Sequence, residues 1–263
     1  MYDFAYQKPA SLADAVKALG GEDAKALAGG QTFIPVLKQR LNKPSVVVDL
    51  SKLGLTGITV TGEAVTIGAM TTHATVARSV EVQRAIPGLA KLAGGIGDKE
   101  VRYRGTIGGS LANNDPSACY PSAVLALGAT IKTDRRSIDA DNDFQGMFTT
   151  ALEPGEVIVS VSFPVPAKAA YVKFKNPASR YAMVGVFVAK GPKGVRVAIT
   201  GAGQGGVFRH KAFEDALTKN WSPDALNGIV TPADGMNSDI HASAEYRAHL
   251  VGVIAKRAVV AAG

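Results

Sequence analysis

Two short glycine-rich stretches, AGGQT at residues 28–32 and TIGGS at residues 106–110, decide how this chain of 263 residues folds. Adjacent glycines let backbone N–H groups converge on anionic oxygens, and Thr32, Thr106 and Ser110 add hydroxyl donors. A single Gly-Gly pair is more often a simple turn. This chain has two Gly-Gly pairs, each close to Ser or Thr residues. We therefore predict that the two stretches form the two halves of one diphosphate-binding site.

The second stretch runs on into LANNDPSACYP at residues 111–121, which is dense in short polar side chains and turn residues. Such a segment is better explained by a site than by a simple connection, so Asn114, Asp115 and Cys119 become candidate ligand contacts. Asp115 could accept a hydrogen bond from a sugar hydroxyl, or it could close a local turn, which is the commoner role of aspartate before proline. Asp49, at the end of a β-branched run, has the same two possible roles.

The composition bounds the class of protein. With 46% hydrophobic and 19% charged residues, the chain can bury a sizeable core in one large or two small domains. The net charge is +7, but the basic residues are scattered and aromatics reach only 6%, which argues against a nucleic-acid-binding stripe. Cys119 is the single cysteine, so this chain alone can hold neither a disulfide nor a cysteine-ligated cluster.

The first residues lack a basic and apolar leader, and no apolar run reaches the roughly 18 residues that a membrane span needs. We therefore expect a cytoplasmic protein that does not cross a membrane.

The hydrophobic periodicity predicts an α+β fold in two domains, 1–166 and 167–263. The first domain has two parts: a small β-α-β-α-β unit over residues 1–53, and a larger mixed α/β part over residues 54–166. The second domain is expected to hold a three-stranded antiparallel sheet covered by helices. The predicted segments of the first domain include a helix at 33–41, a hairpin at 58–67 and a glycine-rich segment at 94–105, which leads into the second glycine-rich stretch at 106–110. Those of the second domain are strands at 171–175, 182–190 and 195–200, and helices at 210–217 and 243–260.

Two other motifs compete for a functional role. GAGQGG at residues 201–206 satisfies the G-x-G-x-x-G pattern after a predicted strand. A dinucleotide fold also needs a second parallel strand with an acidic residue about 20 positions on, and the segment NWSPD at 220–224 breaks such a strand. Of the four histidines, only His241 and His249 are close in sequence, two helical turns apart. A metal site needs a third ligand and usually closer spacing, so we expect the histidines to cap or pack, and His73 to lie at the surface. We predict no catalytic residue and no metal site in this chain.

Four separated blocks of the sequence carry a resemblance to a known family. They are AGGQTFIPVLKQRL (28–41), RGTIGGSLANNDPSACYP (104–121), QGMFTTALEPGEVI (145–158) and SDIHASAEYRAHL (238–250). Together they resemble the FAD-binding medium subunits of molybdenum hydroxylases, most closely those of the carbon monoxide dehydrogenase type. The blocks follow the family's order along almost the whole chain.

This resemblance implies a set of FAD contacts. It implies that residues 26–33 and 106–110 contact the cofactor, that Ile96 and Ile158 lie near it, and that Lys175 stabilises the reduced flavin. Tyr181 is our own candidate for stacking on the ring. Where many relatives carry an aspartate, this chain has Cys119, so a carboxylate contact there is in question. The individual residues predicted to contact FAD are Ala26, Leu27, Ala28, Gly29, Gly30, Gln31, Thr32, Phe33, Ile96, Thr106, Ile107, Gly108, Gly109, Ser110, Asn114, Asp115, Cys119, Ile158, Lys175 and Tyr181.

The resemblance also implies a place in a complex. A large subunit would hold the molybdenum cofactor, a small subunit would hold [2Fe-2S] clusters, and FAD in this chain would pass the electrons to an external acceptor, with a dimer of heterotrimers as the expected assembly. Aldehyde, xanthine and heterocycle dehydrogenases share these motifs, so the same subunit of such an enzyme is an alternative. A free-standing flavin oxidase and a non-catalytic nucleotide-binding module are rivals from other classes.

Overall fold

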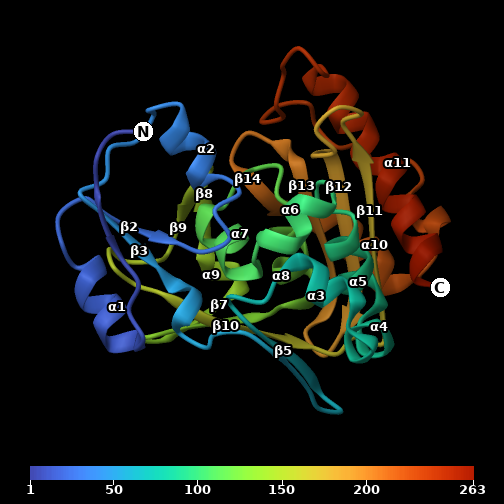
Figure 1. The fold of residues 1–263 in the computed structure, drawn as a ribbon. Helices are drawn as coiled ribbons and strands as arrows, with labels where there is room; N and C mark the ends of the chain where they lie inside the picture. Colours follow the sequence, from blue (N-terminus) through green and yellow to red (C-terminus); the bar gives the residue numbers. More distant parts are fainter.

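The three main sheets follow one another along the chain (Figure 1). A computed structural model describes all residues, 1–263. The first sheet is parallel and the next two are antiparallel, which confirms the predicted α+β class. No helix is long and apolar enough to span a membrane.

The N-terminal unit is the predicted β-α-β-α-β arrangement, with strand order β1-β3-β2 and all pairs parallel. Helix α1 begins where the Ser11 hydroxyl accepts a hydrogen bond from the Asp14 N–H at 3.1 Å. Helix α2 ends at Lys38, three residues before the predicted end at Leu41. The elements are β1 (Ala5–Gln7), α1 (Leu12–Leu19), β2 (Ala24–Leu27), α2 (Phe33–Lys38), β3 (Val46–Asp49) and the 3₁₀ turn η1 (Leu50–Lys52).

The middle part is a five-stranded antiparallel sheet of order β4-β5-β10-β6-β7 with a series of short helices. The strands are β4 (Ile58–Val60), β5 (Ala64–Gly68), β6 (Thr130–Thr133), β7 (Ser137–Asp139) and β10 (Ile158–Pro164), and a small hairpin is formed by β8 (Phe144–Gly146) and β9 (Thr149–Thr150). The helices are α3 (His73–Arg78), α4 (Val80–Ala85), α5 (Pro87–Gly94), α6 (Lys99–Arg104), α7 (Ile107–Asn113), α8 (Tyr120–Leu127) and α9 (Ala140–Asp143).

One segment of the middle part differs from the expectation. The glycine-rich approach at 94–105 contains helix α6, because Asp98 accepts the Val101 N–H at 2.8 Å and caps the first turn. The helix ends at Arg104, so Gly105 leads directly into the second glycine turn.

The C-terminal part is an antiparallel sheet of order β11-β12-β13-β14, one strand more than predicted. The added strand β14 pairs with β13 through Gly203 and Gly206, so the motif at 201–206 forms a hairpin turn rather than a nucleotide-binding loop. The elements are β11 (Lys168–Lys175), β12 (Ala182–Gly191), β13 (Gly194–Gly203), β14 (Gly206–Arg209), α10 (Lys211–Lys219), η2 (Pro223–Leu226) and α11 (Ala244–Ala262).

Helix α8 joins the two larger parts. All eight of its residues are buried, which is typical of a helix that is covered on every side. The largest hydrophobic cluster extends from this helix to Tyr171, Phe187 and Ala198 of the C-terminal sheet. The opposite face of that sheet packs on α10 and α11 in a second cluster. The C-terminal sheet is thus held against the middle part by a shared core.

Candidate functional site: a cavity between two glycine turns

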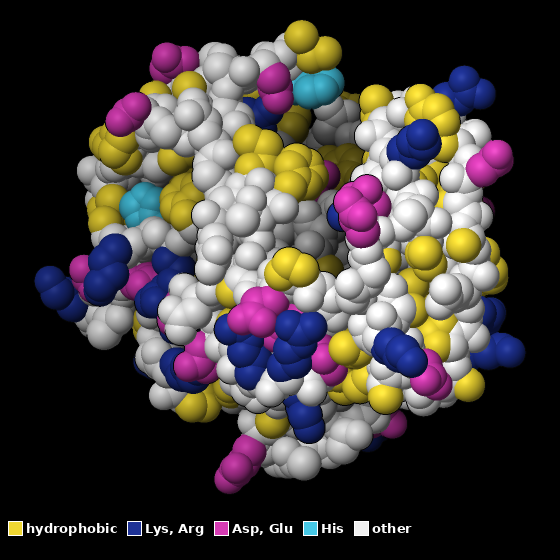
Figure 2. Space-filling view, turned by 90° about the vertical axis from the view of Figure 1, so that its left-hand side faces the viewer, with side chains coloured by type: hydrophobic (Ala, Val, Ile, Leu, Met, Phe, Trp, Pro, Cys, Tyr) yellow, Lys and Arg dark blue, Asp and Glu magenta, His cyan; other side chains and the backbone are white.

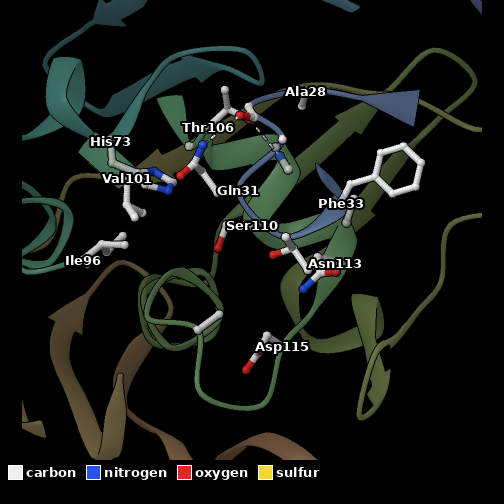
Figure 3. A pocket seen from close by; sticks show the side chains of 18 of the residues that line it. Ala28, Gln31, Phe33, His73, Ile96, Val101, Thr106, Ser110, Asn113 and Asp115 are labelled. Carbon is white, nitrogen blue, oxygen red and sulfur yellow. Dashed lines mark hydrogen bonds between the residues drawn. The ribbon is translucent and has the colours of Figure 1, made fainter. Parts of the chain in front are cut away.

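Both glycine turns line one cavity of about 750 Å³. Its walls come from the N-terminal unit, from the middle part and from the β11–β12 connection. Figure 2 shows the face of the molecule formed by the N-terminal side, which is hollowed, with hydrophobic side chains at the rim. In the close view, Gln31, Thr106 and Ser110 lie together around the space (Figure 3).

The two turns touch through their backbones. A Cβ atom added to Gly29 would lie 2.1 Å from the carbonyl oxygen of Arg104, and one added to Gly109 would lie 3.4 Å from the Cβ of Ala28. Gly30 has a φ of +74°, which favours glycine. Segments almost eighty residues apart therefore form one surface, as the paired motifs predict.

The first turn presents backbone N–H groups that have no acceptor within the chain. The six successive backbone N–H groups from Ala28 to Phe33 make no hydrogen bond within the chain. The hydroxyl of Thr32 also leaves helix α2 without a side-chain cap. Consecutive unpaired N–H groups in a partly exposed turn create a concave site for an anion. The donor set at this turn therefore matches a phosphate or diphosphate.

The second turn differs from the expectation that the N–H groups of both turns converge on the ligand. It is the start of helix α7, and its N–H groups are already used. Ile107 and Gly108 donate to the carbonyls of Thr71 and Ala69 at 3.1 and 2.8 Å, and Gly109 donates to the Thr106 hydroxyl oxygen at 3.1 Å. What this turn adds to the cavity is side-chain donors, namely the Ser110 hydroxyl, which has no partner in the chain, and the amide of Asn113.

The glycines of the second turn serve close packing. A Cβ on Gly108 would lie 2.6 Å from the Cβ of Ala69 on the neighbouring segment. This turn is thus seated against the strand β5 region, and its position is fixed before any ligand binds.

Most of the predicted contact residues line the cavity. These are Ala26, Ala28, Gly29, Gly30, Gln31, Thr32, Phe33, Ile96, Thr106, Gly108, Gly109, Ser110, Asp115, Cys119, Ile158 and Tyr181.

Four predicted residues lie elsewhere. Leu27 packs beneath the first turn, and Ile107 is fully buried in the core. Asn114 has a φ of +41°, and its amide nitrogen donates to the carbonyls of Gly146 and Thr149 at 2.8 and 2.9 Å, so it fixes the β8–β9 hairpin. Lys175 is exposed and does not reach the cavity, whereas Lys173 lines it.

The two candidate aspartates have different positions. Asp115 lines the cavity and also closes a turn, because it accepts the Ser117 N–H at 2.8 Å. Burial raises the pKa of its carboxyl group. Asp49 lies outside the cavity wall, where it accepts hydrogen bonds from the Tyr6 hydroxyl and from the Ser51 N–H. Asp115 therefore remains available to a ligand and Asp49 serves the local fold.

His73 is a wall residue that the sequence interpretation missed. The expectation of a surface position is wrong, because the side chain is buried at 5% exposure and lines the cavity. Burial, with a contribution from the nearby charge of Arg102, lowers its pKa to about 4, so the ring is neutral at pH 7. Its Nδ1 atom has no hydrogen-bond partner. Its backbone N–H donates to the Gly105 carbonyl, a long-range pairing that no local sequence signal reveals.

The cavity volume falls in the range of about 300–1,000 Å³ that is common for small-molecule and cofactor sites. Along residues 1–263, no three His, Cys, Asp or Glu side chains lie close enough to hold a metal ion. The free donors at one turn, the hydroxyl and amide groups at the other and the mixed apolar walls fit a dinucleotide with a diphosphate at its centre.

The chain is similar to proteins of known function. Residues 2–166 match the family described as FAD binding domain in molybdopterin dehydrogenase. The nicotine 6-hydroxylase medium subunit of Paenarthrobacter nicotinovorans is 37% identical over 98% of this chain and 96% of its own length. The carbon monoxide dehydrogenase medium chain of Afipia carboxidovorans is 36% identical over 97% of this chain and 95% of its own.

Solved structures agree with the sequence comparison. A chain of the reconstituted CO dehydrogenase from Oligotropha carboxidovorans superposes with a TM-score of 0.91 at 34% identity, covering 99% of this chain and 97% of that chain. A chain of quinoline 2-oxidoreductase from Pseudomonas putida 86 gives a TM-score of 0.87 at 30% identity, covering 99% and 96%.

Proposed function

The chain belongs to the family of FAD-binding domains of molybdopterin dehydrogenases, and from this membership we propose how its cavity holds the cofactor. It is the flavoprotein subunit of a molybdenum hydroxylase, an oxidoreductase complex whose molybdenum and iron–sulfur centres belong to other subunits. FAD, when bound, would supply the electron-transfer chemistry between those centres and an external acceptor.

We propose that the first turn binds the FAD diphosphate. The free N–H groups from Ala28 to Phe33 are the observation that carries this assignment, since an anion would satisfy donors that the chain leaves unpaired. The Ser110 hydroxyl and the Asn113 amide add donors from the facing turn. We place Ile96, Ile158 and Tyr181 against the isoalloxazine ring, because a flat aromatic ring needs apolar or aromatic walls.

The proposed function requires no general acid or general base among the residues of the cavity wall. Neutral His73 and the turn-closing Asp115 both line the cavity. The Nδ1 atom of His73 has no hydrogen-bond partner, and the carboxylate of Asp115 accepts the Ser117 N–H. The role of the chain is to bind FAD, to hold it against both turns and to exclude water from part of it. Substrate oxidation then takes place in a partner subunit.

The proposed assembly contains a large molybdenum-binding subunit and a small iron–sulfur subunit, arranged as a dimer of heterotrimers in the cytoplasm. The proposed reaction is most like that of carbon monoxide dehydrogenase, because medium chains of two such enzymes are 36% and 35% identical to this chain. Hydroxylation of an aromatic heterocycle is the second candidate, because the medium subunit of nicotine 6-hydroxylase is 37% identical. These identities are nearly equal although the substrates differ.

The test is FAD binding by the complex and by a variant with Ser110→Ala. We expect one FAD per medium chain, and we expect the variant to bind FAD about tenfold more weakly, which is the loss of one hydrogen bond to a charged group. Ser137→Ala is the matched control, because Ser137 is exposed on β7 outside the cavity. Unchanged FAD affinity in the Ser110 variant would contradict the proposal that the second turn donates a hydrogen bond to FAD.

Co-purification tests the rival classes. A single flavin-containing polypeptide that oxidises a substrate by itself would indicate a free-standing oxidase. A colourless chain that binds a nucleotide other than FAD would indicate a binding module.

A further inference from the structure

Lys173 is the cation that touches three walls of the cavity at once. Its Nζ atom donates to the carbonyl of Gly95 at 2.8 Å and to the carbonyl of Arg180 at 2.8 Å, and it lies 3.6 Å from the sulfur of Cys119. A lysine ammonium has three donors, so these three acceptors use all of them. The side chain is thus held in one position.

Each acceptor belongs to a different segment of the wall. Gly95 caps the end of α5 and precedes Ile96, and Arg180 precedes Tyr181 in the β11–β12 connection. Cys119 lines the cavity itself, just before α8. Since Lys173 lies on β11, one side chain of the C-terminal sheet ties that sheet to two segments of the middle part.

The positive charge of Lys173 has no carboxylate partner. None of the salt bridges of the chain includes it, and two of its three acceptors are backbone carbonyls. The residue is half-buried at the cavity wall. An uncompensated charge in a partly desolvated position acts more strongly on a neighbouring ligand than one in water.

Lys175, two residues further along β11, differs in each of these respects. It follows an irregularity in the pairing of β11 with β12, between Phe174 and Lys175. It is exposed and lies outside the cavity wall. The two lysines therefore form a matched pair on one strand, of which one faces the site.

We propose that Lys173, rather than Lys175, is the positioning residue of the flavin site: it holds the walls at Ile96, Cys119 and Tyr181 together and places a positive charge beside the reduced flavin. The inference rests on the proposed binding of FAD in this cavity. A fixed cation favours the reduced, more negative form of the cofactor and so raises its reduction potential.

The experiment compares Lys173→Met and Lys175→Met in the complex assembled with its partner subunits. The readouts are the FAD content, the FAD dissociation constant and the midpoint potential of the flavin, with the iron–sulfur contribution subtracted from a FAD-stripped sample. For Lys173→Met we expect about tenfold weaker FAD binding. Its two-electron reduction should also become about tenfold less favourable, which corresponds to a potential about 30 mV lower. For Lys175→Met we expect wild-type values.

Lys173→Arg keeps the charge and is the second variant. We expect it to restore most of the potential even where the tighter contacts of Lys173 are lost. The inference is overturned if Lys173→Met keeps both the affinity and the potential of the wild type, or if Lys175→Met lowers them equally. A wild-type complex without FAD in this chain would instead overturn the proposed function itself.

Discussion

Replacing Asp143 by asparagine should stabilise the protein, and the gain should grow as the pH rises. Asp143 ends helix α9 and is completely buried, and neither of its carboxyl oxygens has a hydrogen-bond partner. Burial, together with the negative charge of Glu156, raises the pKa of Asp143 from 3.8 to about 6. The folded protein therefore holds this proton more tightly than the unfolded chain does.

The size of the effect follows from that difference. A shift from 3.8 to about 6 at about 1.36 kcal/mol per pKa unit corresponds to roughly 3 kcal/mol. Below pH 4 the carboxyl is mostly protonated in both states, so the effect on unfolding is small. Between pH 4 and 6 the unfolded chain loses the proton first, and stability falls as the pH rises. Above pH 6 the full destabilisation is present.

Asparagine has nearly the same shape as the protonated acid but cannot ionise. The free energy of unfolding of Asp143→Asn should exceed that of the wild type by about 3 kcal/mol at pH 8, and by less than about 1 kcal/mol at pH 4. Urea unfolding of the FAD-free protein at a series of pH values measures this difference. Asp234→Asn, at an exposed position without hydrogen bonds, is the matched control and should show no such trend. A pH-independent gain, or a loss of stability at pH 8, would refute the reasoning.

Two further variants test the contact between the turns and the stability of the protein in acid. Gly29→Ala should weaken FAD binding at least about tenfold, because the added Cβ would lie 2.1 Å from the Arg104 carbonyl oxygen and would separate the turns. Gly205→Ala is the control, because an added Cβ there has no neighbouring atom within 4 Å, and it should bind FAD like the wild type in the same titration. The hydrogen bond from Arg136 lowers the pKa of Glu156 from 4.5 to about 2, so stability should be lost as the pH falls through that interval. Acid unfolding of Glu156→Gln should lack this component, and an identical acid profile would show that the pair does not contribute.

The substrate chemistry of the complex is separate from the fold of this chain. Relatives named for nicotine, carbon monoxide and glyceraldehyde are between 32% and 37% identical over almost all of this chain. These relatives differ in the substrate for which they are named, whereas the family match over residues 2–166 concerns FAD binding.

The sequence alone determined much of the fold and the first half of the site. Local signals sufficed where the physics is local: the predicted hairpin at 58–67 is formed by β4 and β5. The two glycine turns were predicted to lie together because two separated motifs agreed, and both turns line one cavity. The fourth strand β14 was missed because four residues after a turn carry little periodic signal.

Only the tertiary structure decided which donors are free and which charges face the cavity. The N–H groups of Ile107 and Gly108 in the second turn donate to the carbonyls of Thr71 and Ala69. These acceptors lie more than thirty residues away, and no local sequence pattern reveals them. In the same way, Lys173 rather than Lys175 reaches the wall because an irregularity in the strand pairing redirects the chain between them. Local sequence specifies the conformation of a segment, whereas the hydrogen bonds and charges that surround a ligand depend on contacts between distant segments, which exist only once the chain has folded.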